Sequence, residues 1–252
     1  GFTFDPKCFY DELAGRFVVL ALEVYGPTEA WLDIAVSDDG DPNGTWYKYR
    51  TDAVVWNGTQ SYWVDYPGFG YDDLAYYVTG NLFGLNAGGW GGVLFRIFDK
   101  TPLLTGGTAT WSDLQDTGSG SVQVAECHTA NRNPLFVSLY SGSAIKVHAL
   151  RQPLTNPSLT YTTVSVPGFS GPPGAPDLTG GVLDCLDGRI VNADFRDDTL
   201  LAAHGINNGN NKTVARWYEF ANNNWPQRGA TVTLTQSGDV DLGGDVYTWY
   251  PG

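Results

Sequence analysis

The feature that most constrains the fold is a repeat of about 60 residues. Residues 4–22 (FDPKCFYDELAGRFVVLAL) return in altered form at residues 64–83 (VDYPGFGYDDLAYYVTGNLF), with an early Asp, a Pro, a Tyr-Asp turn and an apolar run in both. Asp5 and Asp65 are 60 positions apart. Repeats of this length are typical of folds in which each unit is one supersecondary structure that buries its apolar surface against its neighbours.

Later parts of the chain continue the repeat. Residues 186–206 (LDGRIVNADFRDDTLLAAHGI) form a further copy, with Asp187 placed 122 positions, or two periods of 61, after Asp65. Residues 121–140 occupy the phase between these copies and keep only the strand at its end. The closing TWYPG at residues 248–252 repeats the VDYPG of the second copy. We therefore count four copies and the start of a fifth.

Each copy contains three or four short runs rich in Val, Tyr, Phe and Thr, separated by Gly, Asp, Asn and Pro, as expected for short strands and turns. Only five of the 27 acidic residues are Glu, Met is absent and Gly occurs 32 times, which disfavours helices. Antiparallel strands repeated every 60 residues without helices are typical of a β-propeller. A β-sandwich would not explain the period.

We predict an all-β chain with a single β-propeller domain over residues 1–252. The expected blades are residues 1–60, 61–118, 119–180 and 181–244, and residues 245–252 are expected to begin the next one. A fragment of a ring of five to seven blades is the interpretation we favour. The unbroken apolar run FVVLAL at residues 17–22 predicts a strand buried on both faces by neighbouring blades.

Charge and hydropathy exclude several partners. The formal net charge is -13, which argues against nucleic acid because binding there needs a basic surface. The run at residues 17–22 is far shorter than the roughly 20 residues of a membrane span. The chain begins at Gly1, as expected of a mature secreted chain or a fragment. We expect extracellular or cell-surface localisation, which makes the sequons at Asn43, Asn57 and Asn211 candidate glycosylation sites. The alternative is that these sequons occur by chance in a chain rich in Asn and Thr.

The three cysteines, Cys8, Cys127 and Cys185, have the spacing of neither a zinc site nor a redox pair. Two interpretations remain open. Cys127 and Cys185 form a disulfide and leave one free thiol, or all three are separate thiols.

Four segments together resemble a group of secreted β-propeller proteins of bacteria and other microbes. These are DPKCFYDELAGRFVV (5–19), DYPGFGYDDLAYYVTGN (65–81), RIVNADFRDDTLLAAHGI (189–206) and ARWYEF (215–220). The resemblance covers nearly the whole chain, and it implies a propeller and an exported location but no reaction.

A weaker resemblance is to five-bladed glycosidases of the arabinanase type, whose blades often begin with Asp-Pro and whose inner strands carry the reacting carboxylates. It implies Asp5, Asp65 and Glu126 as candidate catalytic residues. Glycoside hydrolysis needs one protonated and one ionised carboxyl group. The alternative for Asp5 and Asp65 is structural, because an Asp-Pro pair commonly opens a turn and caps backbone amides.

Residues 37–46 (SDDGDPNGTW) are similar to the Asp-box turn of sialidase-type propellers, with one residue too many. That resemblance implies a structural hairpin with Trp46 packed over it. Asp38, Asp39 and Asp41 are alternatively candidate calcium ligands, although the distal acid of most calcium loops is missing.

No nucleophile, phosphate-binding or dinucleotide motif occurs, and His128, His148 and His204 lack metal-site spacing. We interpret these histidines as core or rim residues. The nine Trp and 14 Tyr suit wedges between blades or contacts with sugars and proteins. We therefore predict an extracellular binding or structural assembly module without a cofactor, calcium excepted, whose partners are other protein subunits or carbohydrate. The alternative is a propeller-type glycoside hydrolase or lyase.

Overall fold

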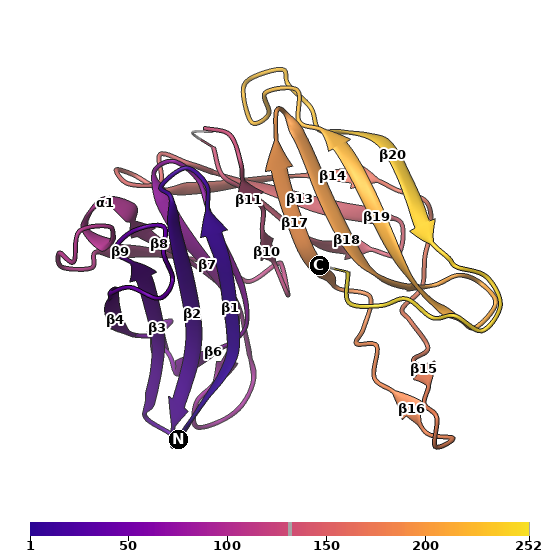
Figure 1. Ribbon diagram of the computed structural model, residues 1–252, viewed down its shortest axis with the longest axis horizontal. Helices are drawn as coiled ribbons and strands as arrows, with labels where there is room; N and C mark the ends of the chain where they lie inside the picture. Colours follow the sequence, from indigo (N-terminus) through magenta and orange to yellow (C-terminus); the bar gives the residue numbers. More distant parts are fainter. Residues whose placement is uncertain (131–132, 252) are drawn as a thin grey trace.

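The computed structural model describes residues 1–130 and 133–251 of an all-β chain. The parts of the predicted repeats that fall on residues 131, 132 and 252 lie outside these ranges. Four sheets follow one another as the blades of a four-bladed β-propeller, so the predicted fold class is confirmed (Figure 1). Within these ranges, the helix α1 (Lys100–Leu103) has four residues. No helix in the described part of the chain is long and apolar enough to cross a bilayer.

The first two sheets are antiparallel, and their strands lie in chain order. The first contains β1 (Phe2–Asp11), β2 (Arg16–Tyr25), β3 (Glu29–Ser37) and β4 (Trp46–Asp52). The second contains β5 (Val55–Trp56), β6 (Ser61–Tyr71), β7 (Ala75–Gly84), β8 (Trp90–Asp99) and β9 (Trp111–Asp116).

The third and fourth sheets each take a strand from one short segment of the chain, residues 123–127. This segment lies in the region between the blades, which we call the hub of the propeller (Figure 1). The third sheet contains β10 (Gln123–Val124), β12 (Leu135–Ser141), β13 (Ala144–Arg151) and β14 (Ser158–Ser165). The fourth contains β11 (Glu126–Cys127), β17 (Ile190–Arg196), β18 (Thr199–Asn207), β19 (Thr213–Ala221) and β20 (Thr233–Val240). A separate small hairpin consists of β15 (Ala175–Pro176) and β16 (Val182–Leu183). The neighbouring strands β10 and β11 thus join different blades, and β11 runs parallel to β17.

The sequence repeat is visible in the backbone. The residue before the repeated proline has a positive φ in three copies: 46° at Asp5, 51° at Tyr66 and 49° at Tyr250. In the first two copies the strand pairing shifts at this point, as in a β-bulge. A bulge bends its strand and increases the local twist. The conserved feature of the repeat is therefore a bend in the first long strand of a blade.

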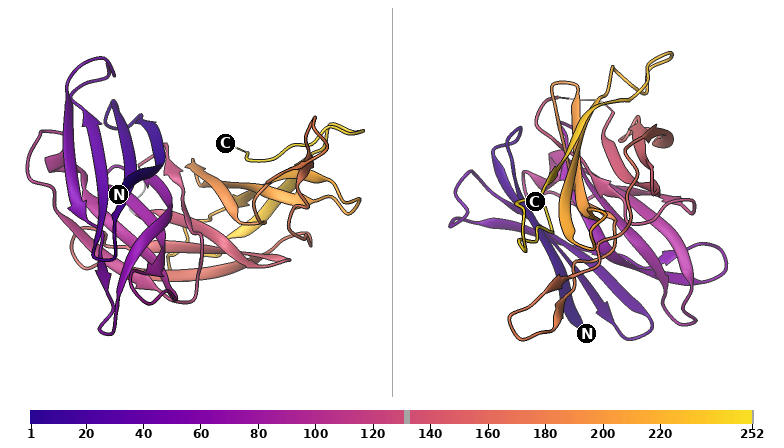
Figure 2. Two further views of the ribbon diagram at one scale, coloured as in Figure 1. Left: turned by 90° about the horizontal axis from the view of Figure 1, so that it is seen from below. Right: turned by 90° about the vertical axis from the view of Figure 1, so that its right-hand side faces the viewer.

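Three buried apolar clusters hold the blades together, and each joins two consecutive sheets. Figure 2 shows the succession of the sheets from two further sides. No such cluster joins the first sheet to the fourth within the described ranges. Representative members are Leu20 and Tyr76 between the first and second sheets, Phe95 and Phe136 between the second and third, and Val147 and Phe195 between the third and fourth.

Burial distinguishes the middle blades from the end blades. Eight consecutive residues of β7 are buried, and so are six of β13, because each of these sheets is covered on both faces. In β2, by contrast, Val18, Leu20 and Leu22 are buried, whereas Val19 and Ala21 are half-exposed. The prediction that residues 17–22 are buried on both faces is therefore wrong, since the first sheet is packed against another blade on one side only.

A buried ion pair links the first two blades. Lys100 Nζ lies 2.7 Å from Asp11 Oδ2, and both side chains are almost completely buried. The same carboxylate accepts hydrogen bonds from the Tyr76 hydroxyl and from the backbone N–H groups of Leu13 and Ala14. The Lys100 ammonium also lies 4.8 Å from the centroid of the Tyr76 ring. The Asp11 carboxylate thus has a partner for each of its lone pairs. Removal of either the Lys100 or the Asp11 charge would leave the other charge buried without its partner.

We expect Lys100→Met to lower the free energy of unfolding by about 3–5 kcal/mol, because it leaves the Asp11 carboxylate buried without its cation. Arg50→Met, which removes a solvent-exposed ion pair with Glu23, should have a much smaller effect, because water and salt screen that pair. Urea unfolding followed by tryptophan fluorescence measures both. Equal effects of the two substitutions would contradict this account of the blade contact.

Candidate functional site

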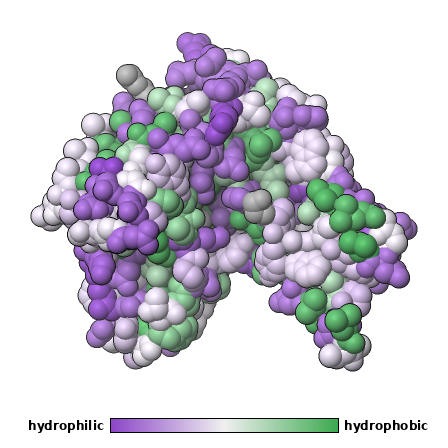
Figure 3. All heavy atoms as spheres, in the orientation of Figure 1, coloured by the Kyte–Doolittle hydropathy of each residue, from purple (hydrophilic) through white to green (hydrophobic). Residues whose placement is uncertain are grey.

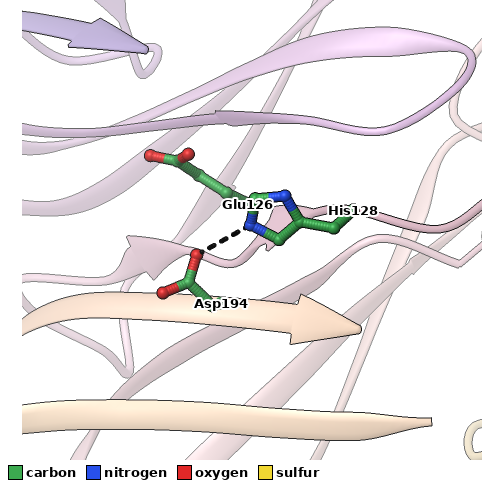
Figure 4. A group of neighbouring side chains, drawn as sticks. All are labelled: Glu126, His128 and Asp194. Atoms are coloured by element: carbon green, nitrogen blue, oxygen red, sulfur yellow. Dashed lines mark hydrogen bonds and ion pairs between the residues drawn. The ribbon is translucent and has the colours of Figure 1, made fainter. Parts of the chain in front are cut away.

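The hub of the propeller brings together Glu126, His128 and Asp194, from β11, the residues just after it and β17 of the fourth sheet (Figure 4). The parallel pairing of β11 with β17 places Glu126 opposite Asp194. The His128 N–H donates to the Phe195 carbonyl oxygen at 2.9 Å, which continues the alignment for one more residue. Glu126 and His128 are two residues apart along an extended segment, so their side chains share one face.

One ligand-type atom from each of these three residues lies within 4.8 Å of the other two. His128 Nε2 lies 3.2 Å from Asp194 Oδ1. Its Nδ1 lies 3.4 Å from an oxygen of Glu12, and the Glu12 carboxylate lies 3.5 Å from Arg196. Glu12 follows β1, so the first and fourth blades meet at this cluster.

The hub carboxylate of Glu126 is electrostatically unfavourable. Burial raises its pKa to about 7, and the nearby charge of Asp194 adds to the effect, whereas His128 and Lys7 oppose it. The described residues donate no hydrogen bond to this carboxylate. His128 Nδ1 is likewise shielded from solvent without a hydrogen bond in this part of the structure. The Glu126 carboxylate and His128 Nδ1 therefore have unfulfilled bonding capacity beside the charge of Asp194, and such groups are ones that a cation would satisfy.

The donor set indicates which cation fits. Two carboxylate oxygens and one imidazole nitrogen suit Zn²⁺ or Mn²⁺, whereas Ca²⁺ takes six to eight oxygen ligands. The cluster could also carry acid–base chemistry, because two neighbouring carboxyl groups with different environments can hold different protonation states. A shallow pocket of about 250 Å³ beside it is lined in part by His128, Asp194 and Leu201.

The predicted catalytic residues are divided between two places. The Asp65 carboxylate accepts the N–H of Tyr66 at 2.9 Å, and its pKa is raised by burial and then by the charge of Asp5. Asp5 and Asp65 are therefore neighbours, and both lie in the bulged segments of the repeat. Glu126 groups instead with His128 and Asp194.

Sequence reasoning missed His128 and Asp194. The spacing of Glu126 and His128 was a signal for a shared face, but the pairing with β17 carries no signal of its own. The other two histidines are internal and bonded. His204 binds the Gly188 carbonyl oxygen and the Tyr218 hydroxyl, and His148 binds the Ser138 hydroxyl.

The acidic turn at residues 37–46 uses carboxylates to hold its own backbone. Asp39 accepts the N–H of Asp41 at 2.7 Å, and Asp41 accepts the N–H of Asn43 at 2.9 Å. Trp46 Nε1 donates to the carbonyl oxygen of a turn residue. Within the described ranges, the group of three ligand-type side chains close enough for a metal is the hub cluster, which includes none of Asp38, Asp39 and Asp41.

None of the three cysteines forms a disulfide. Cys8, Cys127 and Cys185 are free thiols, which corrects the disulfide interpretation for Cys127 and Cys185. These two sulfurs have different partners, the carbonyl oxygens of Thr129 and Leu183.

The sequon residues Asn43, Asn57 and Asn211 are exposed. Their side chains are therefore accessible for glycosylation, which stays a prediction.

No family model matches the chain, and no curated protein matches it. The resemblances to secreted microbial propellers and to arabinanase-type enzymes therefore stay sequence-based predictions.

We expect Glu126→Gln to stabilise the fold at pH 8. The folded-state pKa of about 7 lies above the ordinary value of 4.5, so the ionised Glu126 destabilises the fold above pH 7. This penalty shrinks as the pH falls from 7 towards 4.5 and vanishes below it. The gain should be on the order of 1–2 kcal/mol at pH 8 after solvent screening, and near zero at pH 4. Urea unfolding at both pH values measures it. A pH-independent difference would contradict the assignment.

Proposed function

We propose that the chain is an extracellular, non-catalytic binding or structural module whose hub binds one divalent transition metal ion. The observation that carries the proposal is the convergence of Glu126, His128 and Asp194 within 4.8 Å, with no hydrogen bond to Glu126 in the part described. Bound there, a cation would offset the repulsion between the two carboxylates and connect β11 to β17.

The wider surroundings agree with such a role. Glu12 approaches His128 from the first blade, so a cation at the hub would also act where the first and fourth blades lack a shared apolar cluster. A net charge of -13 favours the accumulation of cations around the molecule. The exposed sequons and the acidic surface support an extracellular location, with carbohydrate or other protein subunits as partners.

Metal binding is tested by titration calorimetry of the metal-stripped protein at pH 7.5 with Zn²⁺, Mn²⁺ and Ca²⁺. We expect one site for Zn²⁺ or Mn²⁺ and weaker binding of Ca²⁺. His128→Ala and Asp194→Asn should each weaken binding at least about tenfold, because loss of a direct ligand should cost no less than loss of an outer-shell partner. Asp39→Asn, in the acidic turn, is the matched control and should leave the affinity unchanged. Absence of saturable binding, or loss of it in the control alone, would refute the proposal.

A second candidate function is glycoside hydrolysis, and the raised pKa of Glu126 beside Asp194 favours it. A carboxyl group with a pKa of about 7 can donate a proton near neutral pH, and a close second carboxylate can act as nucleophile or base. In this arrangement Asp5 and Asp65 would lie outside the reacting pair.

Hydrolysis predicts that the protein releases reducing sugar from plant or algal polysaccharides and that Glu126→Gln abolishes the release. Asp65→Asn should retain it, because Asp65 does not group with Glu126. Release that survives Glu126→Gln, or no release from any polysaccharide, would eliminate this candidate.

A further inference from the structure

A polar pocket of about 390 Å³ lies at one end of the fourth blade. Its walls come from the turn between β17 and β18, the loop between β19 and β20, and residues shortly after β11. None of Glu126, His128 and Asp194 lines it, so the pocket is separate from the metal-binding cluster of the hub. Figure 3 shows hydrophilic residues gathered over this end of the blade, at the top of the view.

One buried polar atom of the pocket wall has no partner. Asn222 lines the pocket and is only 3% exposed. Its Nδ2 donates to the Trp225 carbonyl oxygen at 3.0 Å and approaches the Asp198 carboxylate, which fixes the orientation of the amide. Its Oδ1 is shielded from solvent and accepts no hydrogen bond from the described residues. Because a buried acceptor without a donor is unfavourable, a hydroxyl group of a ligand would stabilise this atom.

The loop that carries Asn222 is held in place by the protein itself. The Asp198 carbonyl oxygen accepts the Asn222 N–H at 2.8 Å. The Asp198 carboxylate accepts the N–H groups of Asn223 and Asn224 at 2.9 and 3.2 Å. A pocket whose walls are ordered before binding keeps the entropic cost of binding low.

The size and the lining of the pocket indicate the class of ligand. A volume of about 390 Å³ is far larger than one metal ion and lies in the range of small-molecule sites. The Asp197 carboxylate, which accepts no hydrogen bond from the described residues, is an acceptor like Asn222 Oδ1, and the side-chain amide of Asn224 both donates and accepts. The ring of Trp225 adds an apolar wall. A sugar matches this combination, since its hydroxyl groups donate and accept and its C–H face is apolar.

The pocket continues into a larger groove. Gln227 lines both the pocket and a neighbouring groove of about 730 Å³. Thr155 and Ser158 line that groove with hydroxyl groups, and Leu154 with an exposed apolar side chain. Two adjoining hollows fit an extended ligand of several units better than a compact one.

The charges along this path differ between its two parts. Among the described residues, the charged side chains that line the pocket are those of Asp197 and Asp198. Arg151 lines the neighbouring groove, and its guanidinium donates to the Pro226 carbonyl oxygen. Two carboxylates repel an anionic group, so the unit that enters the pocket is expected to be a neutral sugar.

We propose that this pocket binds one unit of a neutral oligosaccharide and that the adjoining groove holds the next units. The inference rests on the proposed binding role of the chain, and it names the place where a carbohydrate partner is held. It needs no metal ion at the hub, because the two sites share no residue.

Titration calorimetry of the full chain tests the proposal with neutral tetrasaccharides of glucose, xylose, mannose and galactose, and with tetragalacturonic acid as the acidic counterpart. We expect saturable binding of at least one neutral tetrasaccharide and at least about tenfold weaker binding of the acidic one. Asp197→Asn should weaken binding of the neutral sugar at least about tenfold, because a hydrogen bond to a charged acceptor is lost. Asn is compatible with the positive φ of 48° at this position.

Asn224→Gly is a second variant, which removes the amide where φ is 61° and glycine fits the backbone. It should weaken binding by about threefold or more. Asp245→Asn is the matched control, since Asp245 is exposed and follows β20 at the opposite end of the same sheet, and it should bind like the wild type. Circular dichroism checks that all variants are folded.

Several results would overturn the proposal. These are no binding of any neutral tetrasaccharide, binding that Asp197→Asn leaves unchanged, equal weakening in Asp245→Asn, or binding of Ca²⁺ alone that Asp197→Asn removes. Zn²⁺ or Mn²⁺ binding by Asp197→Asn should equal that of the wild type. Failure to bind sugar with this metal binding intact would leave the proposed hub site standing, and sugar binding without metal binding would leave the pocket standing.

Discussion

The structure depends on the burial of both faces of small twisted sheets against one another. A four-stranded sheet of this size has too little apolar surface to be stable alone, and the chain solves this by placing the next sheet about one sheet thickness away. Three shared apolar clusters result, and the middle blades are the most completely covered. The same requirement explains the aromatic content, because Tyr76, Phe95 and Tyr218 fill the space between blades.

Ionisable groups are also placed between the blades, where solvent is partly excluded, and their stability there depends on whether each charge has a partner. Lys100 and Asp11 satisfy each other, with tyrosine and backbone donors completing their shell. Glu126 has no comparable partner, and its raised pKa reflects that imbalance. The contrast separates a charge that joins two blades from one that is available to a ligand.

Sequence alone predicts the fold well because the repeat is local. The prolines at positions 6, 67 and 251 follow residues of nearly equal positive φ, so equal motifs adopt equal bends. The burial of β2 could not be predicted, because its composition is that of a covered strand and only the arrangement of blades leaves one face open.

The candidate site was predicted only in part. Glu126 is rare by residue type, which made it a candidate, but its neighbours follow from a two-residue parallel pairing across 68 positions of the chain. Such a pairing leaves no periodic pattern in the sequence. The resemblance to glycosidase blades predicts that Asp5, Asp65 and Glu126 lie together, whereas the crossing from β10 to β11 carries Glu126 to another blade.

The measurement that tests the central claim most directly is native-state hydrogen exchange of the chain at a concentration where it is monomeric. If burial of both sheet faces determines local stability, the amides of β7 and β13 should be the slowest to exchange, and those of β2 and β18 should exchange measurably faster. Uniform protection of all four sheets, or greater protection in β2 than in β7, would contradict the account.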